Sequence, residues 1–132
     1  MKKFSELKSG DKIYCIGTMY ITNEETRTFT VNGQIEKFEQ FNLYEINLDG
    51  YGHLAIDEKY YNETSFEKNK FIYFADKNEF CRKMIEIYDN RIHKADEEIE
   101  RYKNLIEYQE RYKNNCRDKI KMYSKEIEFL QT

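Results

Sequence analysis

Apolar residues recur every seven positions through the last third of the chain, with alternating spacings of three and four. One series is Ile85, Ile92, Ile99, Ile106, Lys113, Ile120 and Ile127, and the other is Tyr88, Ala95, Tyr102, Gln109, Cys116, Tyr123 and Leu130. A heptad repeat sustained in one phase is typical of a coiled coil rather than of a helix that lays one stripe on a globular core. The pattern therefore predicts a long helix whose apolar seam needs a partner.

The predicted helix begins near Asp76, a residue type that N-caps helices, with Glu79 three residues later as its reciprocal capping partner. Continued from Lys77 to Gln131, the helix spans roughly 80 Å at about 1.5 Å per residue. The rest of the chain is too short to cover a helix of that length. We therefore expect self-association, with a homodimer favoured. The predicted seam comprises Ile85, Tyr88, Ile92, Ile99, Tyr102, Ile106, Ile120, Tyr123, Ile127 and Leu130.

The charges beside the seam favour a parallel pair of helices. In that arrangement Arg91 of one copy faces Asp96 of the other, and Glu98 faces Lys103, so that both pairs carry opposite signs.

The alternative is a helical hairpin that bends at Asn114-Asn115, where Asn115 would cap a second helix with Asp118 three residues on. Gln109 and Lys113 interrupt the seam close to that point. The uninterrupted heptad phase and the absence of a glycine there favour one continuous helix.

Short strands and turns are expected in the first half of the chain, residues 1–75, which holds all five glycines. Alternating residues indicate strands over Lys12–Ile21, Asn42–Leu48 and His53–Ile56, and a further apolar strand over Lys70–Phe74. Asn32-Gly33 is a dipeptide typical of β-hairpin turns, and we expect a hairpin between Phe29 and Ile35. About five antiparallel strands predict a small barrel or a strongly curled sheet.

The expected fold class is thus α+β. A small antiparallel β domain, residues 1–75, precedes a coiled-coil helical segment, residues 76–132.

Two groups of residues are candidates for ligand binding. The first is Tyr60, Tyr61 and Phe66 in the polar stretch Asp57–Lys70, where exposed rings offer stacking platforms. The alternative is that these rings fold beneath the sheet domain and cap its end. The second group lies on the helix outside the seam and comprises Arg101, Tyr108, Arg111, Tyr112 and Arg117.

Arginine and tyrosine at one-turn intervals can clamp an anionic aromatic ligand such as a nucleotide. The competing interpretation is ordinary pairing within the helix, because Glu97 precedes Arg101 by four residues and Glu107 precedes Arg111 by four.

Metal, cofactor and catalytic chemistry are not expected. The two histidines, His53 and His93, have no cysteine at ligand spacing, and no phosphate-binding loop or nucleophile motif is present. Cys15, Cys81 and Cys116 are odd in number and widely spaced, which favours free thiols in a reducing cytoplasm. A net charge of −3 argues against nucleic acid as a partner, and no apolar run is long enough to span a membrane.

The opening residues Phe4, Leu7, Lys8, Gly10, Asp11, Ile13 and Tyr14 form a pattern that resembles the first turn and strand of small SH3-like barrel proteins. The segment Phe74–Phe80 resembles the strand-to-helix junction of small phage and mobile-element proteins. The layout is also similar to that of the phage anti-Thoeris nucleotide sponges. This similarity implies an oligomer that sequesters a nucleotide signal without cleaving it. The similarity is one of layout only, and no binding residue is carried over from it.

We therefore expect a non-catalytic oligomeric binding protein of phage or mobile-element origin, which sequesters or occludes a nucleotide-like immune signal or a host protein. The alternative is a nucleic-acid-associated factor with an SH3-like barrel, dimerised by its helices.

Overall fold

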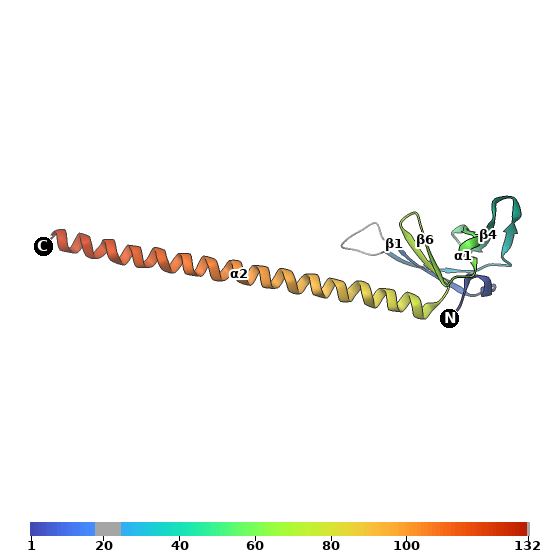
Figure 1. Cartoon of the computed structure of the whole chain (residues 1–132), viewed down its shortest axis with the longest axis horizontal. Coiled ribbons are helices and arrows are strands. Elements are labelled where there is room, and N and C mark those ends of the chain that lie inside the picture. Colours follow the sequence, from blue (N-terminus) through green and yellow to red (C-terminus); the bar gives the residue numbers. More distant parts are fainter. Residues whose placement is uncertain (18–24, 132) are drawn as a thin grey trace. The chain divides into compact units, whose positions relative to one another are not determined.

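The computed structural model describes residues 1–17 and 25–131 and has an α+β fold. Two antiparallel sheets are followed by one long helix, α2 (Lys77–Gln131), as Figure 1 shows. The chain divides into two compact units, residues 1–86 and 87–132. The first ten residues of α2 therefore belong to the unit that contains the sheets.

The first sheet has the strand order β2-β1-β7-β6 and the second has the order β3-β4-β5. The first is built from β1 (Lys12–Gly17), β2 (Glu25–Thr30), β6 (Ser65–Lys68) and β7 (Phe71–Phe74). The second is built from β3 (Glu36–Phe38), β4 (Leu43–Leu48) and β5 (Gly52–Asp57). Short helical turns lie at η1 (Phe4–Glu6), η2 (Glu39–Phe41) and α1 (Glu58–Tyr61). All of the strand pairings in both sheets are antiparallel.

The two sheets share one hydrophobic core. Alternate residues of β1, β4 and β5 are buried because successive side chains of a strand point to opposite faces. The buried core residues are Phe4, Leu7, Ile13, Cys15, Val31, Ile46, Leu48, Leu54, Ile56, Phe66, Tyr73 and Ala75. Among the described residues the strands do not close into a barrel. The expected curled antiparallel arrangement is thus present as two sheets.

The predicted hairpin at Asn32-Gly33 is wrong. The strand before it, β2, pairs with β1, whereas the strand after it, β3, pairs with β4. Val31 bridges to Leu48, and the Asn32 backbone N–H donates to the Asn47 carbonyl at 2.8 Å. The Val31 backbone groups that a hairpin would use are also engaged elsewhere, since the Val31 N–H donates to the Asp11 carbonyl and the Val31 carbonyl accepts the Gly10 N–H, both at 2.8 Å. The dipeptide instead lies where the chain crosses from one sheet to the other.

Seven strands are present where about five were expected. The strand predicted over Lys12–Ile21 is seen as β1, and its remainder lies outside the described residues. The additional hairpin β6-β7 turns at Asn69-Lys70, whose φ angles are 53° and 65°. Two left-handed residues form the turn that suits a two-residue hairpin. Asn-Gly is the dipeptide that usually indicates such a turn in a sequence, so Asn69-Lys70 did not predict the β6-β7 hairpin.

The long helix is continuous through Asn114-Asn115, so the hairpin alternative is wrong. Asparagine in a helix interior costs less than about 1 kcal/mol, and neither residue removes a backbone donor as proline would. The unbroken ribbon of α2 is visible in Figure 1.

Asp76 caps this helix as predicted, because its carboxylate accepts the Glu79 backbone N–H at 3.1 Å. The reciprocal contact from Glu79 is replaced by another. The Glu79 carboxylate accepts the Thr64 hydroxyl at 2.7 Å, and the other Asp76 oxygen accepts the Lys2 backbone N–H at 2.9 Å. These hydrogen bonds thus connect the start of α2 to Lys2 near the N-terminus and to Thr64, the residue before β6.

We expect the Asp76 cap to make the stability of the unit formed by residues 1–86 depend on acid pH. The Lys2 backbone N–H, and then that of Glu79, hold the pKa of Asp76 below its ordinary value against the opposing effect of burial. A lowered folded pKa means that the stabilisation is present above the unfolded pKa, near 4, and is lost as the pH falls below it. Asp11 acts in the same direction through the Lys2 side chain.

Urea unfolding at pH 7 and pH 3 checks this expectation. Asp76→Asn should reduce the difference in unfolding free energy between the two pH values, whereas the exposed Asp118→Asn should leave it unchanged. An undiminished difference in Asp76→Asn would show that other carboxylates carry the dependence.

Candidate association surface on α2

In the C-terminal unit, residues 87–132, the described residues all belong to α2, and no residue of α2 is buried within one copy. All of the predicted seam residues are exposed. Their exposed fractions run from 49% for Tyr88 to 81% for Leu130. The complete set is Ile85, Tyr88, Ile92, Ile99, Tyr102, Ile106, Ile120, Tyr123, Ile127 and Leu130. A helix of 3.6 residues per turn brings residues three and four apart onto one face, so these side chains form one slowly winding stripe.

The two heptad series differ in chemistry. Isoleucine occupies the first position of each heptad except at Lys113, and tyrosine is the commonest residue at the fourth. Isoleucine is stiff at its first side-chain torsion, and β-branched residues at this heptad position favour two-stranded coiled coils. The first positions are thus of the type found in two-stranded coiled coils, whereas the fourth positions carry the leucine typical of such coils only at Leu130.

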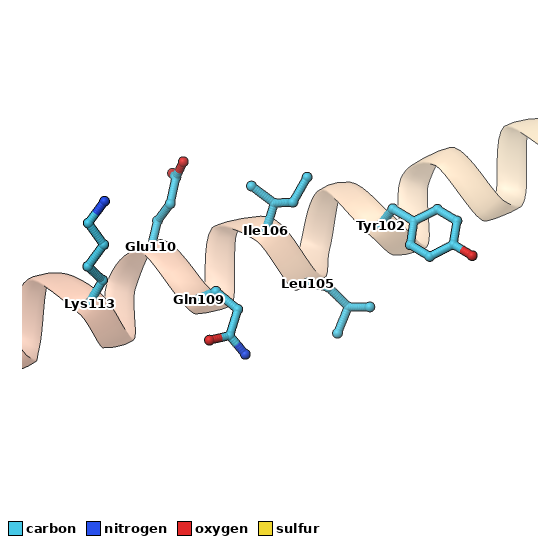
Figure 2. Close-up of a pocket in the computed structure, with 6 residues that line it drawn as sticks. All are labelled: Tyr102, Leu105, Ile106, Gln109, Glu110 and Lys113. Carbon is cyan, nitrogen blue, oxygen red and sulfur yellow. The ribbon is translucent and has the colours of Figure 1, made fainter.

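A concave stretch of the stripe lies where its apolar character is interrupted. It is lined by Tyr102, Leu105, Ile106, Gln109, Glu110 and Lys113. Figure 2 shows these side chains leaving successive turns of the same helix, with Ile106 and Leu105 on opposite sides. Leu105 widens the apolar surface next to the seam and was not among the predicted residues. A second concave stretch involves Phe129 and Leu130 near the end of the helix.

Two of the arginines outside the seam, Arg101 and Arg111, are engaged within α2. Arg101 pairs with Glu98 at 2.5 Å and Arg111 with Glu107 at 3.8 Å, whereas Glu97 had been expected to pair with Arg101. Arg101 also lies over the Tyr102 ring at 5.4 Å, and the Tyr102 hydroxyl together with Glu98 raises the pKa of its guanidinium. The contacts of Arg101 and Arg111 are those of an ordinary charged helix face.

Tyr108, Tyr112 and Arg117 are exposed on the same helix. With Arg101 and Arg111 they share one element, and no second element of the described C-terminal unit closes over them to make a pocket.

Tyr60, Tyr61 and Phe66 do not form an exposed platform. Phe66 is only 6% exposed, and its ring centroid lies 5.1 Å from that of Phe4 and 5.3 Å from that of Tyr73, so Phe66 belongs to the core. Tyr60 and Tyr61 are partly buried against the same core.

Tyr61 stacks on Tyr44 with ring centroids 3.5 Å apart, and burial raises the pKa of its hydroxyl. The polar stretch Asp57–Lys70 contains α1 and β6. The arrangement matches the alternative that these rings cap the sheet domain.

Among residues 1–17 and 25–131 no group of three potential ligands is placed to hold a metal ion. His53 pairs with Glu45 at 2.8 Å, and His93 lies 3.6 Å from Asp89. Cys15 is buried, whereas Cys81 and Cys116 are exposed and free. None of the described helices carries an apolar stretch of the length and composition needed to cross a membrane.

No family model, curated protein or solved structure matches the chain. The heptad stripe of α2 is the largest set of exposed apolar side chains with a regular spacing among the described residues.

Proposed function

We propose that this chain is a non-catalytic binding protein that works as a homo-oligomer, with a dimer favoured. In this proposal α2 joins the copies and the unit of residues 1–86 contacts a target. The observation that carries the proposal is the stripe of exposed isoleucine and tyrosine side chains at heptad spacing along α2.

The isolated C-terminal unit has no packing of its own to stabilise it. In proteins most helical stability comes from packing of an apolar face rather than from intrinsic propensity. A contiguous apolar stripe, unlike scattered single residues, marks an interaction surface. Fully covering one large apolar side chain contributes about 1.5–3 kcal/mol, while association itself costs about 4–15 kcal/mol. A few covered layers are therefore enough to hold two copies together.

We further propose that the oligomer acts by occlusion or sequestration in the cytoplasm of a host cell. Its target is then a host protein or a small nucleotide-like signal, and its source is a phage or mobile element. The similarity in layout to the anti-Thoeris sponges supports this choice. On the N-terminal unit, the exposed rings of Phe38, Phe41 and Tyr51 offer contact area for a target.

Substitution of Arg111 and Arg117, which lie on α2 outside the seam, distinguishes a nucleotide target from a protein target. We expect Arg111→Ala and Arg117→Ala to change the unfolding free energy by less than about 0.5 kcal/mol, because exposed ion pairs on helices contribute little. Isothermal titration with nucleotides checks the rest. Affinity for a nucleotide should fall in these variants if this face binds it, whereas unaltered affinity for a demonstrated nucleotide would remove both arginines from the site.

Native mass spectrometry of the protein purified from its host lysate tests the function as a whole. We expect more than one copy per particle together with a bound metabolite or protein. Particles of one copy with nothing bound would contradict the proposal, and binding that weakens steeply with salt would instead indicate phosphate contacts of a nucleic acid.

A further inference from the structure

We infer that two copies of α2 pair in parallel and in register, so that each residue of the stripe faces its own counterpart. This inference rests on the proposed self-association. It adds the relative direction of the two helices, which self-association by itself does not determine. The occupant of the apolar stripe is a second copy of this chain.

The charges along both edges of the stripe favour the parallel arrangement. In a parallel two-stranded coiled coil, the residue before each first heptad position faces, on the partner, the residue five positions later. This rule pairs Arg91 with Asp96 and Glu98 with Lys103, and each pair occurs twice by symmetry. The later edge positions bring together Leu105 with Glu110, Tyr112 with Arg117, Lys119 with Ser124 and Glu126 with Gln131. No like charges meet along these edges.

The antiparallel arrangement brings like charges together. When α2 overlaps fully with a reversed copy, first and fourth heptad positions face each other, as Ile106 with Tyr102 and Ile99 with Gln109. The edges then place Arg91 opposite Lys119, Asp96 opposite Glu110 and Lys103 opposite its own copy. Only Asp89 and Arg117 form an opposite-charge pair. The electrostatic balance thus reverses with orientation.

The polar layers of the stripe place a cost on the parallel pair and also fix its register. Lys113 faces its own copy in that arrangement, and Gln109 faces its own copy one layer earlier. The Lys113 ammonium can reach outward past Glu110, which lines the same concave stretch, and two facing glutamine amides can each donate and accept a hydrogen bond. A single polar residue at a first heptad position specifies register at some cost in stability.

A parallel pair carries both N-terminal units at the same end, because α2 follows β7 directly in each chain. Two equivalent surfaces tethered in this way can engage a repeated or symmetric target with far higher avidity than one surface alone.

Oxidation of Cys116 in the full-length Cys81→Ser variant tests the orientation. Cys116 is the seam cysteine in the described C-terminal unit, and its parallel counterpart lies within disulfide reach across the seam. In the antiparallel pair the two Cys116 residues are roughly 36 Å apart along the axis. We expect copper-phenanthroline to convert most of the protein to a linked dimer, and Cys81→Ser with Cys116→Ser to give none.

A spin label on Lys125→Cys, in the variant lacking Cys81 and Cys116, gives an independent distance. Lys125 points away from the seam in the heptad, so the label does not disturb it. The parallel pair predicts roughly 20–30 Å between labels, and the antiparallel pair predicts roughly 60 Å. The long distance in a protein of dimeric mass would overturn the inference alone, whereas a monomeric mass would overturn the proposed function as well.

Discussion

The double variant Ile99→Asp, Ile106→Asp should separate into single copies and lose much of the helicity of the C-terminal unit. Both side chains are more than half exposed in one copy, so their burial depends on the partner. A dimer buries four such isoleucines, each contributing about 1.5–3 kcal/mol, and the new carboxylates oppose burial further. We expect the dissociation constant to rise at least about 1,000-fold, as measured by light scattering, with circular dichroism reporting the helix.

The matched control is Asn90→Asp with Asn104→Asp. These substitutions add the same two negative charges to the same exposed helix, at positions facing away from the seam. The control should keep the native mass and helicity. If the isoleucine variant also keeps both, the stripe is not the association surface.

Phe66→Ala should destabilise the unit of residues 1–86 by about 3–5 kcal/mol. The Phe66 ring is buried against Phe4, Tyr60 and Tyr73, so truncation leaves a cavity in the shared core of the two sheets. For a unit of this size the midpoint of thermal unfolding should fall by roughly 12 °C or more. Thermal unfolding followed by near-ultraviolet circular dichroism measures mainly this unit, because 15 of the 21 aromatic residues lie in residues 1–86.

Phe41→Ala is the control for loss of an aromatic ring from the same unit. Its side chain is 68% exposed, and its removal should shift the unfolding free energy by less than about 0.5 kcal/mol. A Phe66 variant as stable as the Phe41 variant would contradict the assignment of Phe66 to the core.

The long helix could be predicted from sequence because its signal is redundant. Each heptad repeats the same information, and Asp76 supplies a recognisable start. A local break such as Gln109 and Lys113 cannot cancel a pattern supported by several turns on either side. This redundancy is the reason why the sequence favoured a continuous helix and not a helical hairpin.

Strand pairing could be predicted only where the turn was short and typical. Asp49-Gly50, a dipeptide typical of tight turns, joins β4 to β5, which pair along the whole of β4 from Leu43 to Leu48. Asn32-Gly33 has the same local character, yet the burial of Val31 against the second sheet sends the chain elsewhere. Local preference was overridden by a tertiary contact that no short window of sequence contains.

Long-range contacts also explain why the position of Phe66 was harder to predict than the positions of the candidate residues on α2. The residues around Phe66 are mostly polar, and the stretch lacks the alternation that indicates a half-buried strand. Its burial depends on Phe4, which is distant in sequence. The helix residues, in contrast, lie where the periodicity puts them, and the Glu107–Arg111 ion pair was predictable from its spacing.

Sedimentation equilibrium of the full-length protein over a dilution series tests the central claim most directly. The account predicts a mass of twice 16.2 kDa at micromolar concentration, with dissociation on dilution accompanied by loss of helicity. A particle of 16.2 kDa at all concentrations that retains the full helix, with its isoleucines in water, would contradict it.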